Sequence, residues 1–209
     1  MNPVRYDPST HFTVTATDVE YVRHGDISLL ARVYQPKGPG PFPMIIDIHG
    51  GGWKLYDRLR QAAIAEEMAA HGIVWASIDM RLNGRAPYPA AAQDINYAVR
   101  WFKAHARDFK GSAEHFGIFG VSSGGHQVIM AALRPNPPDS SAGPLPGALS
   151  VDAKVRYVIA SGAGVDLIES LRAGDQFKLE QYMGGEAGIK ANSPQHVIES
   201  DEVIDTPPM

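Results

Sequence analysis

The chain has 209 residues, of which 44% are hydrophobic and 20% are charged, so it has the composition of an ordinary globular protein of one domain. It contains no cysteine, which excludes disulfides, thiolate catalysis and cysteine-ligated metal centres. A net charge of −4 without a run of lysine or arginine argues against binding of nucleic acid. The lack of a long apolar run argues against a membrane-spanning segment and against a signal peptide, and a cytoplasmic location is therefore expected.

The predicted elements begin with a hairpin, because residues 13–22 and 28–34 have the pattern of strands and a turn around Gly25 separates them. Short apolar runs then alternate with longer helical patterns. The other strands are predicted at residues 44–49, 73–79, 115–121 and 155–161, and the helices at residues 59–71, 89–109 and 122–133. Strands that alternate with helices need crossovers, so we expect one α/β domain over residues 1–209 with a mostly parallel sheet flanked by helices.

Apolar spacing indicates how two of these helices pack. In the first helix, Ile64 and Met68 are expected on one apolar face. The helix at residues 89–109 has Pro89 in its first turn and a longer stripe. That stripe consists of Ile95, Val99, Phe102, Ala106 and Phe109. The proline- and glycine-rich residues 36–43 and 134–150 are predicted loops.

A glycine run, His49-Gly50-Gly51-Gly52-Trp53, comes directly after the strand at residues 44–49. Glycines let backbone N–H groups approach a ligand closely, as the stabilisation of a developing negative charge requires. The alternative is a tightly packed turn without a catalytic role. His49 is expected to anchor the run by hydrogen bonds, and Trp53 either lines a substrate pocket or covers the glycines.

A second motif, Gly-x-Ser-x-Gly, surrounds Ser122 between a predicted strand and a predicted helix. In this context the pattern predicts a nucleophile elbow, a sharp turn that exposes the serine hydroxyl. Small residues are needed at Gly120 and Gly124 because neighbouring chain segments come close. Ser122 is favoured over Ser123 because only Ser122 has glycine two positions before and two positions after it.

With these motifs the sequence resembles the α/β-hydrolase superfamily and, within it, the HGGG-carrying esterases of the hormone-sensitive-lipase-like and acetyl/feruloyl esterase branches. The segments that carry the resemblance are HGGGW (49–53), SIDMRL (77–82), YPAAAQDINYAVRWF (88–102), FGVSSGGH (119–126) and SPQH (193–196). The resemblance runs from about residue 33 onward. It implies an α/β-hydrolase fold with an N-terminal antiparallel hairpin, no cofactor, and cleavage of carboxylic esters through an acyl-enzyme.

The C-terminal part departs from that family. There the acid and the histidine of the triad follow the serine on further strands. Residues 205–209 look like the lead-in to the first of these strands, so we expect the last strands and helix, with the acid and the histidine, beyond the end of this chain. Without a base the serine hydroxyl is a poor nucleophile, so the chain alone is expected to be inactive or nearly so.

Other polar residues could substitute for the acid or the base, or could be structural. Asp166 could serve as an acid placed one strand early, although capping the following helix is favoured. His196 and His126 are the histidines after Ser122. His196 lies in a segment that looks structural, and His126 is expected to be a packing or substrate-side residue. Arg81 and Asp94 are predicted to form a partly buried ion pair. No spacing of residues predicts a metal site.

The sequence therefore predicts a serine carboxylic-ester hydrolase that acts on short acyl or aryl esters. Ser122 is the predicted nucleophile, and the N–H groups of Gly51, Gly52 and Ser123 form the predicted oxyanion hole. The alternatives are an arylformamidase-type amidase and a non-catalytic binding protein that kept the hydrolase shell. The strand at residues 155–161 would lie at the edge of the sheet, so we also expect self-association or poor solubility.

Overall fold

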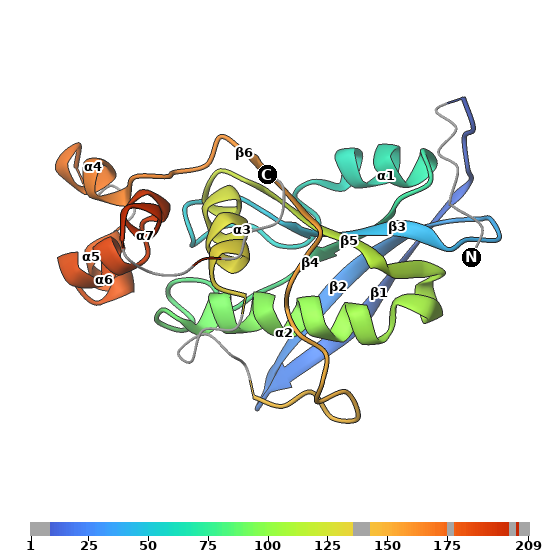
Figure 1. Ribbon diagram of the computed structural model, residues 1–209, viewed down its shortest axis with the longest axis horizontal. Helices are drawn as coiled ribbons and strands as arrows, with labels where there is room; N and C mark the ends of the chain where they lie inside the picture. Colours follow the sequence, from blue (N-terminus) through green and yellow to red (C-terminus); the bar gives the residue numbers. More distant parts are fainter. Residues whose placement is uncertain (1–8, 136–142, 175–177, 201–203, 205–209) are drawn as a thin grey trace.

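The computed structural model describes residues 9–135, 143–174, 178–200 and 204, and its centre is a sheet with the order β1-β2-β4-β3-β5-β6 (Figure 1). The strands are β1 (Val14–His24), β2 (Ile27–Pro36), β3 (Phe42–Ile48), β4 (Val74–Ile78), β5 (Gly111–Val121) and β6 (Tyr157–Ser161). The helices are α1 (Ala62–Ala70), α2 (Ala90–Ala104), the 3-10 helix η1 (Ala106–Phe109), α3 (Ser123–Leu133), α4 (Leu167–Arg172), α5 (Leu179–Met183), α6 (Glu186–Ala191) and α7 (Pro194–Glu199).

The pairing of the strands confirms the predicted fold class. β1 and β2 form the expected antiparallel hairpin, whose turn places Gly25 at a φ of +57°, and β2 also pairs antiparallel with β4. The pairs β3–β4, β3–β5 and β5–β6 are parallel. The result is a mostly parallel sheet with an antiparallel hairpin in front, which is the arrangement of an α/β hydrolase.

Helices cover both faces of the sheet, with α1 on one side and α2 and α3 on the other (Figure 1). Alternate residues of β3 serve the two cores: Ile46 and Ile48 pack with α2 and α3, whereas Ile45 packs with α1. Because β3 is covered on both faces, its sequence is almost continuously apolar. The exception is Asp47, which is buried on the α1 side of the strand.

The predicted face of the first helix is wrong by one position. Ile64 is 43% exposed, while Ala65 and Ala69 are fully buried and Met68 is partly buried. The aromatic side chains that fill this side of the sheet explain the difference. Tyr34 and Trp75 occupy the space under α1, so the helix turns its smallest side chains towards them.

The predicted stripe of the long helix is confirmed, but the helix ends earlier than expected. The first four members of the stripe are buried and Phe109 packs partly against the same core. The α-helix stops at Ala104, the chain continues as η1, and Lys110 then adopts a left-handed conformation with a φ of 55°. The apolar pattern continues through η1 because that turn packs on the same side.

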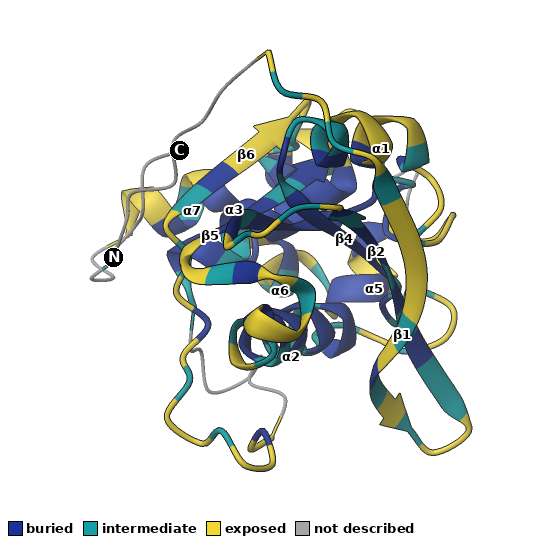
Figure 2. Ribbon diagram, turned by 90° about the vertical axis from the view of Figure 1, so that its right-hand side faces the viewer, coloured by how far each residue is buried: buried dark blue, intermediate teal, exposed yellow. Residues whose placement is uncertain are grey.

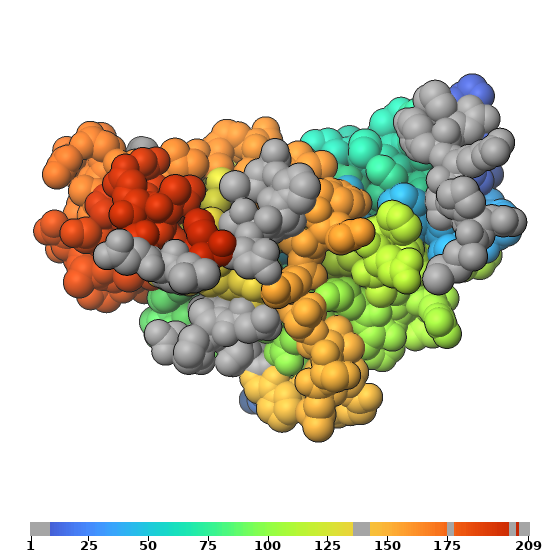
Figure 3. All heavy atoms as spheres, viewed as in Figure 1, coloured from blue at the N-terminus to red at the C-terminus, as the bar shows by residue number. Residues whose placement is uncertain are grey.

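The short helices α4 to α7 were not predicted, since one or two turns are too short to show a helical period. They gather at one end of the molecule beyond α3 (Figures 1 and 3). Trp53 and residues of α4, α5 and α6 form a separate apolar cluster that includes Leu167, Tyr182 and Met183, whereas Val197 of α7 packs against α3. This end of the molecule therefore has its own core next to the glycine run.

β6 lies at the edge of the described sheet, as predicted, and its side chains are largely exposed (Figure 2). Ile159 in this strand is 44% exposed. Of the predicted loop at residues 134–150, residues 136–142 lie outside the described part, and Leu145 is 2% exposed. Within the part of the chain that the structure describes, no helix has the length and apolar character needed to cross a membrane.

Candidate functional site

Ser122 lies at the sharp turn between β5 and α3. Its φ of 55° and ψ of −120° form a strained conformation that costs on the order of 1–3 kcal/mol for a residue with a side chain. The turn is held by hydrogen bonds from its N–H to Ser161 O at 2.8 Å and from the His126 N–H to its carbonyl at 3.0 Å. Ser122 is exposed, whereas Ser123 is 3% exposed and its Oγ has no hydrogen-bond partner.

The glycines on either side of Ser122 are required by close packing. A Cβ atom on Gly120 would lie 2.4 Å from the carbonyl oxygen of Gly124. A Cβ atom on Gly124 would lie 2.1 Å from the carbonyl oxygen of Ile48 in β3. Both contacts are with backbone atoms, which cannot move aside without displacing the strand or the helix. The predicted need for small residues at these two positions is confirmed.

The glycine run lies beside this turn. A Cβ atom on Gly50 would lie 3.2 Å from Ser122 Cβ, so the two predicted motifs meet in space. Gly51 and Gly52 follow with φ values of +122° and +61°, which favour glycine, and the Gly51 carbonyl accepts a hydrogen bond from the Leu55 N–H at 3.0 Å. Helix α3 also begins here, so its first backbone N–H groups lie beside the turn, at the positive end of the helix dipole.

Trp53 continues the run in a left-handed conformation with a φ of 59°, which is unusual for a bulky residue. Its indole Nε1 donates a hydrogen bond to His126 Nδ1 at 3.3 Å. The two rings pack edge to face, with their centroids 5.3 Å apart. His126 Nε2 in turn donates to the Asn192 carbonyl at 2.7 Å. Trp53 therefore lines a cavity and also connects the glycine run to α3 and to the short helices.

These hydrogen bonds fix His126 as a neutral ring with its proton on Nε2. The residue is 2% exposed, and burial lowers its pKa to about 4. His49 is also buried, and its Nδ1 donates to the Gly50 carbonyl at 2.7 Å, as expected for an anchor of the glycine run. Burial lowers the pKa of His49 as well.

None of the chain's eight histidines, all of which lie in the described residues, forms a hydrogen bond with Ser122. His196 lies on α7, and its Nδ1 is buried without a partner. Asp166 caps α4, because its Oδ1 accepts hydrogen bonds from the N–H groups of Ile168 at 3.0 Å and Glu169 at 3.1 Å. The capping interpretation of Asp166 is therefore confirmed, and no acid–histidine–serine chain forms among these residues.

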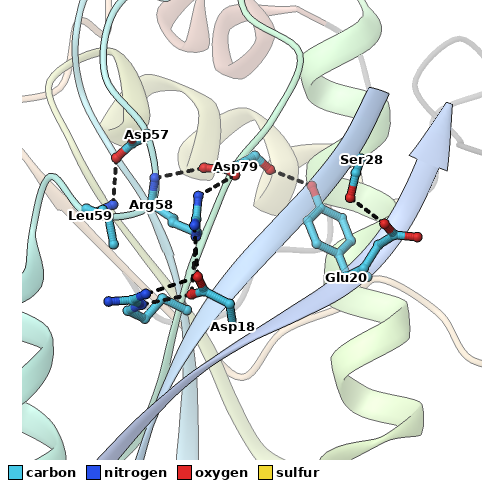
Figure 4. A network of polar contacts seen from close by, with 9 residues as sticks. Asp18, Glu20, Ser28, Asp57, Arg58, Leu59 and Asp79 are labelled. Atoms are coloured by element: carbon cyan, nitrogen blue, oxygen red, sulfur yellow. Dashed lines mark hydrogen bonds and ion pairs between the residues drawn. The ribbon is translucent and has the colours of Figure 1, made fainter. Parts of the chain in front are cut away.

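The far end of the segment that carries the glycines is held by Arg58, which the sequence did not single out. Its guanidinium donates hydrogen bonds to Asp79 Oδ2 at 3.0 Å and to Asp18 Oδ2 at 2.9 Å. Its backbone N–H donates a further hydrogen bond to Asp79 Oδ1 at 2.9 Å (Figure 4). Arg32 binds the same Asp18 through two further hydrogen bonds. The two arginines lower the pKa of Asp18 well below its usual range. This network attaches the segment after Tyr56 to β1 and to the end of β4.

Asp47 is a second residue that the sequence left without a role. It is 1% exposed and accepts hydrogen bonds from Gln61 Nε2 and Ser77 Oγ, both at 2.6 Å. Burial raises the pKa of Asp47 to about 6, because desolvation outweighs these hydrogen bonds. The sequence signal was a single aspartate inside an otherwise apolar strand. Gln61 precedes α1, so this contact fixes the start of that helix.

Arg81 and Asp94 form the predicted ion pair, with Nη2 and Oδ1 at 2.7 Å. Asp94 is fully buried and also contacts His24 Nε2 at 2.9 Å, so it joins α2 to the ends of β4 and β1. Among the residues that the structure describes, no group of three or more histidine, aspartate or glutamate side chains could hold a metal ion.

Comparison with known proteins gives matches of sequence and of structure. The profile of the BD-FAE family matches residues 32–201. Relatives from Mycobacterium tuberculosis include the probable carboxylic ester hydrolase LipM, 31% identical over 57% of this chain and 27% of its own length, and the esterase LipC, 34% identical over 55% of this chain and 29% of its own length. Esterase 2 of Thermogutta terrifontis phosphoramylated by tabun superposes with a TM-score of 0.75 at 22% identity, over 99% of this chain and 72% of that one.

The chain thus spans about a third or less of the length of these curated relatives. The propionate-bound structure of the Thermogutta terrifontis enzyme gives the same fold, with a TM-score of 0.73 at 24% identity over 99% of this chain and 73% of that one. The likeness to the solved structures supports the α/β-hydrolase fold over nearly the whole of this chain.

Proposed function

Because the chain belongs to the BD-FAE family and has the fold of an α/β hydrolase, we propose that it forms the nucleophile-bearing part of a serine carboxylic-ester hydrolase. The observation that carries the proposal is the exposed Ser122 on a strained turn beside the glycine run. Its substrates are small carboxylic esters with a short acyl or aryl group. The esterase names of the relatives support this choice of reaction.

In the proposed mechanism Ser122 Oγ attacks the carbonyl carbon of the ester. The backbone N–H groups of Gly51, Gly52 and Ser123 stabilise the oxyanion that forms. The alcohol leaves to give an acyl-enzyme, and water then attacks the acyl carbon to release the acid and restore the hydroxyl. We assign the histidine and the acid that move the protons to residues outside these 209 positions, since no described histidine reaches Ser122.

The test is an activity-based probe on the 209-residue chain and on a longer natural form of the protein. We expect a fluorophosphonate to add once to Ser122 in the longer form, as read by intact mass and peptide mapping. Ser122→Ala removes the adduct, and Ser123→Ala retains it because the backbone N–H at that position remains. The 209-residue chain is expected to react slower by a factor on the order of 10⁶, the effect of losing a triad histidine.

The outcomes separate the proposal from its alternatives. Hydrolysis of an N-formyl aromatic amide in preference to an aryl ester would favour an arylformamidase-type amidase. A longer form that folds but neither labels nor hydrolyses either compound would favour a non-catalytic binding protein. Rapid labelling of the 209-residue chain itself would overturn the assignment of the base to residues outside it.

We further propose that residues 1–209 belong to a single domain, that the chain resides in the cytoplasm, and that it self-associates through β6. The support for self-association is the unpaired edge of β6, in which Ile159 is 44% exposed. Ile159→Lys places a charge on that edge and is expected to reduce the mass measured by light scattering. A 209-residue chain that is monomeric at working concentration would contradict this part of the proposal.

A further inference from the structure

A cavity of about 130 Å³ lies on the face of the sheet that α2 and α3 cover, and residues of α5 and α6 also line it. Trp53 forms part of its wall. Among the described lining residues there is neither the predicted nucleophile Ser122 nor any of the three predicted oxyanion-hole residues. The cavity therefore adjoins the candidate active site through Trp53 and is distinct from it.

The size and the wall of the cavity favour an aromatic guest. An apolar cavity of about 150 Å³ is large enough to take benzene, so the space here is suited to one six-membered ring. Aromatic rings and flexible thioethers make up much of the wall, and both pack well against a flat apolar guest. These side chains are Trp53, Tyr88, Tyr182, Met130 and Met183.

Most polar side chains of the wall already have partners within the protein. The side-chain amides of Asn96 and Asn192 donate to backbone carbonyls at 2.6 Å and 2.8 Å, and Arg134 Nη1 donates to another at 2.8 Å. Both ring nitrogens of His126 are also hydrogen-bonded. A charged guest would lose its hydration without gaining an unpaired counterion, so the described wall favours an uncharged guest.

Gln127 on α3 is the exception among these polar residues. Its side chain lines the cavity and is 8% exposed, and its Nε2 is buried without a hydrogen-bond partner. No other described residue of the wall has a buried side-chain nitrogen or oxygen in this state. An unpaired buried polar group costs free energy, and a guest that supplies the missing partner recovers it. The cavity therefore offers one polar contact in a wall that is otherwise apolar or internally satisfied.

We propose that this cavity is a binding site for a small uncharged phenol, with its ring between α2, α3 and α5 and its hydroxyl hydrogen-bonded to the Gln127 amide. A hydroxyl both donates and accepts, so it pairs with either end of the amide. Phenols are also the alcohols that hydrolysis of aryl esters releases, so the site would take one product of the proposed reaction. That link rests on the proposed function, whereas binding itself needs neither Ser122 nor a completed triad.

The test compares phenol with benzene, which lacks only the hydroxyl, and with benzoate, which carries a charge. Affinities are measured on the full 209-residue chain by ligand-observed NMR titration. We expect saturable phenol binding, about fivefold weaker binding of benzene because one hydrogen bond is missing, and at least tenfold weaker binding of benzoate. Equal affinities for phenol and benzene, benzoate binding as tight as that of phenol, or no binding of phenol by the folded chain would each overturn the proposal.

Gln127→Met tests the proposed polar contact. Methionine has about the same length as glutamine but cannot form the hydrogen bond, so phenol binding is expected to weaken about fivefold while benzene binding does not weaken. This difference between the two probes separates a lost hydrogen bond from a general change in the cavity. A variant that binds phenol as the parent does would refute the contact with Gln127.

Three further variants locate the binding site. Ala92→Met extends a side chain from α2 into the cavity and is expected to abolish phenol binding. Ala104→Met makes the same change at an exposed position of the same helix and leaves binding unchanged, which controls for folding and helix propensity. Ser122→Ala is expected to bind phenol as the parent does. Loss of binding in Ser122→Ala would place phenol at the nucleophile and refute a separate site, whereas failure of the fluorophosphonate reaction alone would refute only the proposed function.

Discussion

Asp47 is buried on the α1 face of the sheet, and His126 is buried on the opposite face, where α2 and α3 pack. The aspartate receives hydrogen bonds from Gln61 and Ser77 but forms no ion pair with a described cation. The imidazole donates one hydrogen bond and accepts another, which satisfies its neutral form. Burial therefore raises the pKa of the carboxyl to about 6 and lowers that of the imidazole to about 4.

The difference teaches that the two faces respond to acid in opposite directions. Between about pH 4 and 6 the folded protein holds a proton on Asp47 that the unfolded chain has released, so this face becomes more stable as the pH falls. Between about pH 6.5 and 4 the unfolded chain binds a proton at His126 that the folded protein excludes, so that face becomes less stable as the pH falls. In the parent protein the two contributions largely cancel.

The largest expected effect comes from the close contact between α3 and β3. Gly124→Ala would place its Cβ atom 2.1 Å from the Ile48 carbonyl, so α3 and β3 would have to move apart. We expect a loss of about 4 kcal/mol in the free energy of unfolding, at the upper end for a single substitution. Urea unfolding measures it. Gly143→Ala is the control, because its Cβ atom would meet nothing within 4 Å, and an equal effect of both changes would refute the steric account.

Asp47→Asn tests the α1 face alone. The amide of the new asparagine cannot titrate. It can still accept a hydrogen bond from Ser77 and form one with the side-chain amide of Gln61. A pKa of about 6 against an ordinary value of 3.8 corresponds to about 3 kcal/mol. The stability of the variant relative to the parent is therefore expected to increase by about that amount from pH 4 to pH 7. Urea unfolding at several pH values measures this change, and a pH-independent difference would show that Asp47 is ionised throughout.

His126→Gln tests the opposite face and is expected to change with pH in the opposite sense. Relative to the parent, the variant gains stability as the pH falls from 6.5 to 4, by about 3 kcal/mol, because the imidazole no longer resists protonation. The same unfolding series measures this slope. His49 has a lowered pKa as well, but it is present in both proteins and cancels in the difference. A variant that instead loses stability relative to the parent as the pH falls would mean that His126 is charged in the folded protein.

The sequence predicted the parts of this comparison that depend on local pattern. The strands, the long helix, the elbow glycines and the Arg81–Asp94 pair follow from spacing and residue type, and the structure confirms them. The buried face of α1 could not be predicted, because it depends on Tyr34 and Trp75, which come from strands paired only in the folded protein.

The long-range partners were hidden from the sequence for the same reason. The Trp53–His126 bond joins residues far apart in the chain, and no local motif connects an indole in a loop to a helix position. Arg58 was overlooked because an arginine in a polar segment has no periodic signal, although its partners lie on β1 and after β4. Asp47 was visible as an interruption of an apolar strand, but its pKa depends on how completely α1 covers it.

The smallest expected effect concerns the charged network beside the α1 face, where Arg58 and Arg32 share Asp18 (Figure 4). Arg58→Gln removes contacts to Asp18 and Asp79 from a side chain that is 17% exposed, and we expect a loss of about 1 kcal/mol. Arg32→Gln removes only the Asp18 contact from a side chain that is 33% exposed, and about 0.3 kcal/mol is expected. Urea unfolding at low and high salt compares the two losses, which salt should reduce.

Activity separates these two arginines more sharply than stability does. Arg58 follows the glycine run in the chain, whereas Arg32 lies on β2 away from it. In a form of the protein that contains the proposed histidine and acid, Arg58→Gln is therefore expected to lower kcat for an aryl ester about tenfold with little change in KM, because the N–H groups of the run are proposed to stabilise the transition state more than the bound ester. Arg32→Gln should leave both constants unchanged. Equal losses of kcat in the two variants would show that the network affects activity only through stability. The glycine run would then be positioned from the Trp53 side alone.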